Sequence, residues 1–123
     1  LIIHGQVMDA SVYFKMADLV ITQSGHSTAM ELLTLGKPSI MVPDANQTEQ
    51  ENNARRMVEL GVSRQITYDT LSGGTLKTVI TDMLATDTHQ QAAEQMAQRA
   101  DDIHGAAAAA NVLREYAHRL LAY

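Results

Sequence analysis

The sequence predicts an α/β fold: a Rossmann-like parallel sheet with helices on both faces, followed by a helical C-terminal tail. Apolar runs of strand length alternate with stretches of helical character along most of the chain. The runs are continuously apolar, which is typical of strands that are buried on both faces beneath crossover helices. The 123 residues fit a single domain, with an α/β part over residues 1–87 and the tail over residues 88–123.

Four short runs rich in apolar and β-branched residues are predicted to be strands. These runs are Leu1–His4, Leu19–Thr22, Pro38–Val42 and Arg64–Thr67. The stretches between and after them have helical character and are about Asp9–Met16, Thr28–Leu35, Glu49–Leu60 and Gly74–Leu84. Asp9 is the expected N-cap of the first helix. Gly36 with Pro38 ends the second helix, and Gly61 ends the third.

An Ala-rich helical tail from about Gln90 to Leu121 completes the chain. Apolar residues recur at three- and four-residue steps in its first half, which predicts an amphipathic helix packed on one face. These residues are Ala93, Met96, Ala97, Ala100 and Ile103. The Ala106–Ala110 run has strong helix propensity and no chemistry.

The composition excludes several classes of function. The formal net charge is −5 and no cluster of Lys or Arg is present. Because proteins bind nucleic acids through concentrated positive charge, neither DNA nor RNA is an expected partner. The chain has no cysteine and no apolar run of membrane-spanning length, so we expect a cytoplasmic protein, free or peripheral to the membrane at full length. Because the sequence begins at Leu1 without an initiator Met, we expect a piece of a longer protein.

The first of two polar loops lies at the carboxyl edge of the predicted sheet, where open parallel sheets bind ligands. It leads from a strand directly into a helix, and its residues are Ser24, Gly25, His26, Ser27 and Thr28. Free backbone N–H groups, hydroxyls and the positive end of a helix dipole suit an anion such as a diphosphate. Thr28 and Glu31 also fit a capping box, in which both side chains cap the helix instead.

The second loop runs from Pro43 to Gln50, and it too can be interpreted either as a helix cap or as a ligand-binding segment. Thr48 and Glu51 fit a capping box, which places Glu49 and Gln50 in the first turn of the helix. A carboxylate beside an amide offers the hydrogen-bond acceptors and donors that sugar hydroxyls need. The loop is therefore a candidate sugar-binding segment.

Together the two loops resemble the donor-binding signature of glycosyltransferases of the B fold. The matching residues are Thr22, Gly25, Thr28, Glu31, Gly36, Pro38, Pro43, Glu49, Gln50, Asn53 and Ala54. A similar string occurs in the UDP-glycosyltransferases and in the bacterial peptidoglycan N-acetylglucosaminyltransferases. Ser24-Gly25 and the spacing of Asp9, Ala17 and Asp18 resemble the second group. The resemblance covers residues 5–60 well.

The resemblance implies roles for the residues near the first loop. Ser24 to Thr28 would bind the donor diphosphate, and Glu31 would accept hydrogen bonds from the ribose hydroxyls. Main-chain groups near Gln6 and Val7 would contact the base.

For the second loop, the resemblance implies that Glu49 and Gln50 hold the transferred sugar. Asn53 and Ala54 are expected to serve packing and helix geometry. Gln23 stands where plant members have a histidine, and that histidine's role is not carried over.

No catalytic residue, metal or cofactor is predicted. His26 stands where plant members have an aromatic residue, and it is expected to be structural or a ligand contact and not a general base. The other four histidines lack metal-ligand spacing.

Compared with the complete domain that it resembles, the chain is expected to lack strands. In the strand order 3-2-1-4-5-6, Leu1–His4 would be the third strand, and the runs at Leu19–Thr22, Ser39–Val42 and Arg64–Thr67 the fourth to sixth. The edge of Leu19–Thr22 would then be bare. We expect Leu1–His4 either to pair beside it or to pair with a second copy in a homodimer.

These features predict the donor-binding part of a glycosyltransferase that takes a sugar from a nucleotide diphosphate sugar, with a UDP-sugar as the expected partner. The acceptor would be bound by a missing N-terminal domain or a partner chain, so the isolated chain is expected to be inactive. Two alternatives remain open: a nucleotide-sugar hydrolase or epimerase of the same fold, and a non-catalytic fragment or interaction module.

Overall fold

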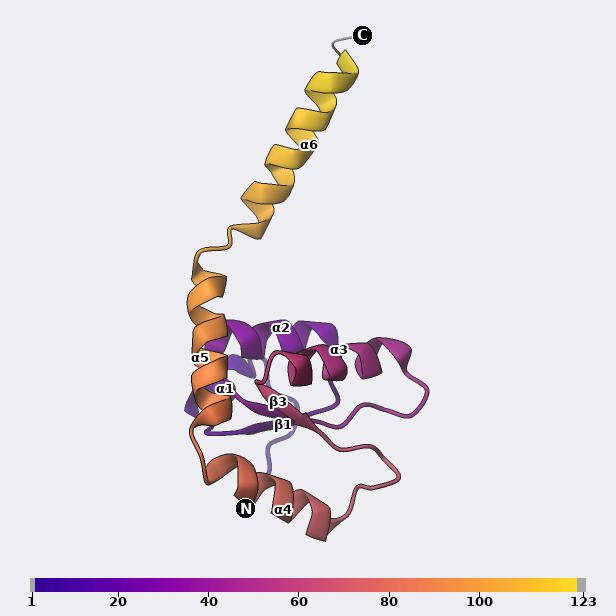
Figure 1. Ribbon diagram of the computed structural model, residues 1–123, viewed down its shortest axis with the longest axis vertical. Coiled ribbons are helices and arrows are strands. Elements are labelled where there is room, and N and C mark those ends of the chain that lie inside the picture. Colours follow the sequence, from indigo (N-terminus) through magenta and orange to yellow (C-terminus); the bar gives the residue numbers. More distant parts are fainter. Residues whose placement is uncertain (1, 122–123) are drawn as a thin grey trace.

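The computed structural model describes residues 2–121 and contains three short strands and six helices over that range (Figure 1). In chain order they are α1 (Ser11–Met16), β1 (Val20–Thr22), α2 (His26–Leu35), β2 (Ser39–Met41), α3 (Thr48–Glu59), β3 (Ser63–Gln65), α4 (Gly73–Leu84), α5 (Thr88–Asp101) and α6 (Gly105–Leu121). The predicted alternation of strands and helices is confirmed from the second predicted strand onward.

The sheet is parallel, with strand order β1-β2-β3. Val20 pairs with Ser39 and Ser39 pairs with Ser63, so the three strands start level with one another. The hydroxyls of Ser39 and Ser63 are buried and hydrogen-bond to each other at 2.6 Å. That bond satisfies two polar groups that would otherwise be costly inside the sheet.

Helices cover both faces of this sheet, as predicted. Figure 1 shows α2 and α3 on one side of the strands and α4 on the other. The core beneath α2, α3 and α5 consists of Val20, Ala29, Leu32, Met41, Ala54, Met57, Val62 and Ala93. The core beneath α4 consists of Ile40, Val42, Ile66, Val79 and Met83. Neighbouring residues of a strand point to opposite faces, so the central strand β2 is buried on both and reads as continuously apolar after Ser39.

The strand predicted at Leu1–His4 is wrong for the residues that the structure describes. Leu1 lies outside the described residues, while Ile2 and Ile3 are each 82% exposed and belong to no strand. The ring of His4 lies against that of Tyr13 in α1, with centroids 4.8 Å apart. Pairing of the segment beside β1 is therefore also wrong, since β1 pairs with β2 alone among the described strands.

The first helix begins later than predicted. Its N-cap is Ala10, but the Asp9 carboxylate still accepts a hydrogen bond from the Ser11 N–H at 2.8 Å. Hydrogen bonding to Ser11 lowers the pKa of Asp9, because it favours the charged form of the carboxylate.

The helical tail is present as two helices, α5 and α6. α5 packs against α2, and its apolar stripe is inward from Ala93 to Ala100. The expected extension of that stripe to Ile103 is wrong, since Ile103 is 68% exposed. α5 ends at Asp101, and the residues between it and Gly105, where α6 begins, are not helical. α6 then projects away from the sheet (Figure 1).

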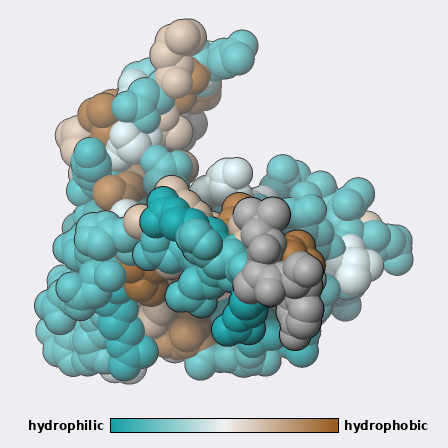
Figure 2. All heavy atoms as spheres, turned by 90° about the horizontal axis from the view of Figure 1, so that it is seen from above, coloured by the Kyte–Doolittle hydropathy of each residue, from teal (hydrophilic) through white to brown (hydrophobic). Residues whose placement is uncertain are grey.

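The projecting helix leaves apolar side chains in solvent. The large ones on α6 are Val112, Leu113, Tyr116 and Leu120. In the view from above, hydrophobic patches interrupt a largely hydrophilic surface (Figure 2). α6 is amphipathic without contacting the sheet, so it contributes little to the two cores.

His89, in the first turn of α5, makes the stability of the chain depend on pH. Its Nδ1 is buried without a hydrogen-bond partner among the described residues. Desolvation, with a smaller contribution from Arg64, lowers the pKa of His89 below 6.5. The unfolded state then binds more protons between the two pKa values, so the contribution to stability is complete above pH 6.5 and is lost as the pH falls through the folded pKa.

We therefore expect the free energy of unfolding to decline on acidification below pH 6.5, and His89→Gln to reduce that decline. Urea unfolding of both proteins across a pH series measures it. An identical pH dependence in the variant would show that other groups cause the decline.

Candidate functional site

Two polar loops meet at the carboxyl edge of the sheet. Thr22, the last residue of β1, pairs with Met41, the last residue of β2, so the loops that follow these strands start side by side. The first loop covers residues 23–25 and leads into α2, and the second covers residues 42–47 and leads into α3. This is the edge of the sheet at which the sequence predicts the candidate site.

The first loop turns sharply at Ser24. Its φ is 73°, in the left-handed region that residues other than glycine rarely adopt. The Ser24 side chain is fully buried, and its Oγ has no hydrogen-bond partner among the described residues. A buried hydroxyl without a partner is uncommon in a native structure.

The helix after this loop begins at His26 with Gly25 as its N-cap, two residues earlier than predicted. Thr28 is therefore the third residue of the helix and Glu31 the sixth, so the capping-box interpretation of this pair is wrong. The first helical bond joins the Ala29 N–H to the Gly25 carbonyl at 3.0 Å. The N–H groups of the first turn have no partner within the helix and are free to meet an anion.

The second loop is held by its own helix. α3 begins at Thr48 with Gln47 as its N-cap, and no side chain caps it, so the capping box of Thr48 and Glu51 is wrong as well. Gln50 instead folds back, and its Oε1 accepts the Asp44 N–H at 2.8 Å. The amide NH₂ of Gln50 keeps its two donors for other partners, while Glu49 is exposed in the same turn.

A set of hydrogen bonds, here called the loop network, joins both loops to α3. Gln23 Nε2 donates to the Asp44 carboxylate at 3.2 and 3.4 Å, which links the loops directly. Asn53 Nδ2 donates to the Ser24 carbonyl at 3.0 Å, and Gln50 holds Asp44. The loop network consists of Gln23, Ser24, Asp44, Gln50 and Asn53.

The structure brings most of the predicted site residues to this edge. Ser24 is buried, Gly25, Thr28, Glu31 and Gln50 are half-buried, and the exposed members are His26, Ser27 and Glu49. Gln6 and Val7 lie in the exposed segment before α1, and no hydrogen bond of the described residues joins them to the two loops.

Sequence reasoning missed three members of the loop network: Gln23, Asp44 and Asn53. Ala54 serves packing as predicted and is fully buried, but Asn53 does more than pack. Residues three apart on a helix share a face, so the spacing of Gln50 and Asn53 was the available signal that both reach toward the loops.

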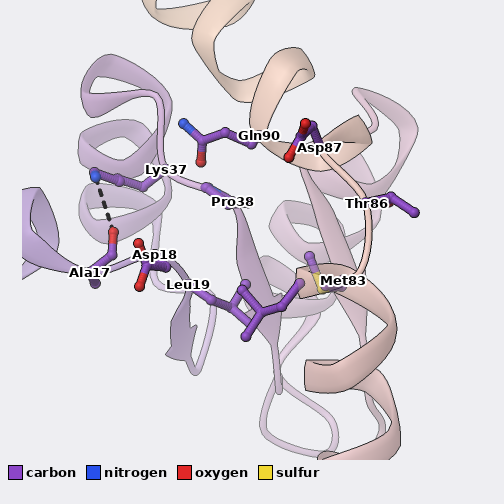
Figure 3. A pocket seen from close by; sticks show the side chains of 10 residues that line it. Ala17, Asp18, Leu19, Lys37, Pro38, Met83, Thr86, Asp87 and Gln90 are labelled. Carbon is purple, nitrogen blue, oxygen red and sulfur yellow. Dashed lines mark hydrogen bonds between the residues drawn. The ribbon is translucent and has the colours of Figure 1, made fainter.

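Two hollows lie near the sheet edges. One of about 610 Å³ opens beside the second loop, between Pro43, Arg55 and Tyr68. The other, of about 350 Å³, lies at the amino ends of β1 and β2 (Figure 3). There the Lys37 ammonium donates to the Ala17 carbonyl at 3.0 Å, and Asp18 and Gln90 also line the hollow. Ligands of parallel sheets bind at the carboxyl edge, so the two-loop edge is the better candidate.

Across residues 2–121, none of the helices combines the length and apolar character that crossing a membrane requires.

Comparisons with known proteins agree on one family. The model of the glycosyltransferase family 28 C-terminal domain matches residues 6–112. An uncharacterized glycosyltransferase of Methanosarcina acetivorans is 34% identical over 103 residues, which are 84% of this chain and 26% of the relative.

A relative with a more specific description is the UDP-N-acetylglucosamine–N-acetylmuramyl-(pentapeptide) pyrophosphoryl-undecaprenol N-acetylglucosamine transferase of Exiguobacterium sibiricum. It is 42% identical over 81 residues, which are 64% of this chain and 22% of the relative. The chain therefore spans about a quarter of the length of the curated relatives it matches.

Among solved structures, CalG4, the calicheamicin glycosyltransferase, superposes with a TM-score of 0.79 at 22% identity. The match covers 94% of this chain and 29% of that one. At this identity the likeness establishes the fold, and it agrees with the parallel sheet and flanking helices described above.

Proposed function

This chain belongs to the glycosyltransferase family 28 C-terminal domain family, and on that premise we propose that it binds the nucleotide diphosphate sugar donor of a glycosyltransferase. The observation that carries the proposal is the open N-terminus of α2 beside the buried, unpartnered hydroxyl of Ser24. Backbone donors and a helix dipole come together at the start of α2, next to this turn, where an anionic group would be stabilised.

In this proposal the diphosphate lies against the first turn of α2, from Ser24 to Thr28. When the bond between the sugar and the diphosphate breaks, negative charge builds up on the oxygens of the phosphate that carried the sugar. N–H groups already fixed in the helix meet that charge without reorganising, which lowers the barrier to transfer. His26 is exposed at the start of α2 and would be a ligand contact.

The ribose and sugar would be held by side chains farther from the phosphates. Glu31 is half-buried one turn into α2, and its carboxylate would accept hydrogen bonds from the ribose hydroxyls. Glu49 would accept from the sugar, whereas Gln50 would donate, because its Oε1 already accepts from Asp44. The base would be contacted by the main chain near Gln6 and Val7.

We propose a UDP-sugar as the donor, supported by the relatives whose names specify UDP-N-acetylglucosamine. The acceptor and the group that removes its proton would be supplied by an N-terminal domain or partner chain, so these 123 residues alone would not transfer sugar. We also propose that the protein is cytoplasmic, which the absence of cysteine supports.

Titration of the chain with UDP, UMP and uridine tests donor binding. We expect UDP to bind most tightly, because its second phosphate reaches the end of α2. Glu31→Ala is expected to abolish measurable binding with little change in the melting temperature, since Glu31 is not a capping residue. Calorimetry and thermal melts measure the two effects.

Glu59→Ala is the matched control, because it removes the same charge from the last turn of α3, far along the helix from the loops. Wild-type chain that binds no UDP at millimolar concentration would overturn the proposed function. Equal UDP affinity in the wild type and in Glu31→Ala would remove Glu31 from the site.

A further inference from the structure

One helix, α3, holds both loops of the candidate site. Gln50 and Asn53 are three residues apart and lie on the same face of α3. Gln50 accepts from the Asp44 N–H in the second loop, and Asn53 donates to the Ser24 carbonyl in the first. The spacing of the two loops is therefore set by the side chains of a rigid element and not by the loops alone.

The Ser24 conformation needs such support. A non-glycine residue in the left-handed region costs on the order of 1–2 kcal/mol, and such conformations persist where the surroundings fix them. Ser24 is fully buried in this conformation, with φ 73°. The bond from Asn53 is partly buried, so it is less weakened by water than the exposed bond from Gln23 to Asp44.

The contact with Asn53 also fixes the direction of a backbone donor. The carbonyl of Ser24 and the N–H of Gly25 belong to one planar trans peptide, in which they point in opposite directions. Asn53 holds the carbonyl toward α3, so the Gly25 N–H points away from α3. That N–H precedes the free N–H groups of the first turn of α2 and extends the same row of donors.

We propose that Asn53 is a positioning residue for diphosphate binding: it holds the Ser24–Gly25 peptide so that the Gly25 N–H faces the phosphate. The inference rests on the proposed function and deepens it, since Asn53 itself need not touch the donor. The isosteric variant Asn53→Asp keeps the shape of the side chain and removes its N–H donors. Asn53→Ala removes the whole amide.

Asn52 provides matched controls on the same helix. It is exposed, its Oδ1 accepts a hydrogen bond from Arg55, and no hydrogen bond among the described residues joins it to the loops. Asn52→Asp therefore adds the same charge as Asn53→Asp one residue away, and Asn52→Ala makes the same truncation. Each variant is titrated with UDP by calorimetry at a temperature where melts show it fully folded. Amide hydrogen exchange of residues 24–27 is measured in parallel.

We expect both Asn53 variants to bind UDP about tenfold more weakly than their Asn52 counterparts, which corresponds to the loss of one ordinary hydrogen bond. We also expect amides 24–27 to exchange faster in the Asn53 variants. Equal UDP affinity in folded Asn53 and Asn52 variants would overturn the inference.

A wild type that binds no UDP overturns the proposed function instead. The exchange measurement still decides the inference about the loop in that case: unchanged exchange at residues 24–27 in both Asn53 variants shows that Asn53 does not position it.

Discussion

Ser27→Asp is expected to weaken UDP binding by at least about tenfold while leaving the chain as stable as the wild type or more stable. Ser27 is exposed at the second position of α2, and the first turn of that helix has no acidic residue. A carboxylate there interacts favourably with the helix dipole, typically by about 0.3–1 kcal/mol. The same carboxylate would repel a diphosphate bound at that helix end.

The opposite signs make this experiment selective, because damage to the fold would lower both stability and affinity. Thermal unfolding and calorimetric titration measure the two quantities, and Ser27→Asn is the uncharged control of similar shape. A Ser27→Asp protein that is stabilised and still binds UDP like the control would show that the diphosphate lies elsewhere. Added salt should reduce the difference between the two variants, since the repulsion is electrostatic.

The order of the three strands was predictable because their signals are local. Runs such as Leu19–Thr22 and Pro38–Val42 are apolar, β-branched and bounded by turn residues, and parallel crossovers place neighbours in chain order side by side. Leu1–His4 carries a similar signal but forms no strand over the described residues. Composition indicates that a segment suits a strand, whereas its pairing partner depends on the rest of the sheet.

Helix ends were less predictable, for a different reason. Ser24, Ser27, Thr28 and Thr48 are all good capping residues, yet none of their side chains caps α2 or α3, whose N-caps are Gly25 and Gln47. The left-handed turn at Ser24 starts α2 at His26, ahead of the predicted Thr28. Likewise, the apolar periodicity of α5 continues through Ile103, although the helix has already ended at Asp101.

The candidate site was located from two loops that follow neighbouring strands, and the resemblance to glycosyltransferases is confirmed as family membership. The loop network was not predictable to the same degree. Hydrogen bonds such as that from Asn53 to Ser24 join residues 29 positions apart, and they depend on how α3 lies over the first loop. Chemistry of individual residues is visible in a sequence, whereas the partner that holds each of them is a property of packing.

Gly36→Ala is expected to lower the free energy of unfolding by about 2–5 kcal/mol, a large share of the stability of a small domain. Gly36 follows α2 at φ 64°, and the Lys37 N–H closes the helix by donating to the Leu32 carbonyl at 2.9 Å. A Cβ at Gly36 would lie 3.2 Å from the Ala97 Cβ and 3.4 Å from the Glu94 Cα. Those atoms belong to α5, whose backbone would have to move away from α2.

Gly61→Ala separates the two causes of this loss. Gly61 ends α3 at φ 74°, but a Cβ there meets only the Ala92 Cβ at an ordinary distance of 3.8 Å. Its substitution should therefore cost only the conformational strain, about 1–2 kcal/mol. Urea unfolding of both variants measures the difference, which reports the close packing of α5 on α2. Equal losses would mean that α5 yields readily at Gly36 and that the α2–α5 contact is looser than the structure indicates.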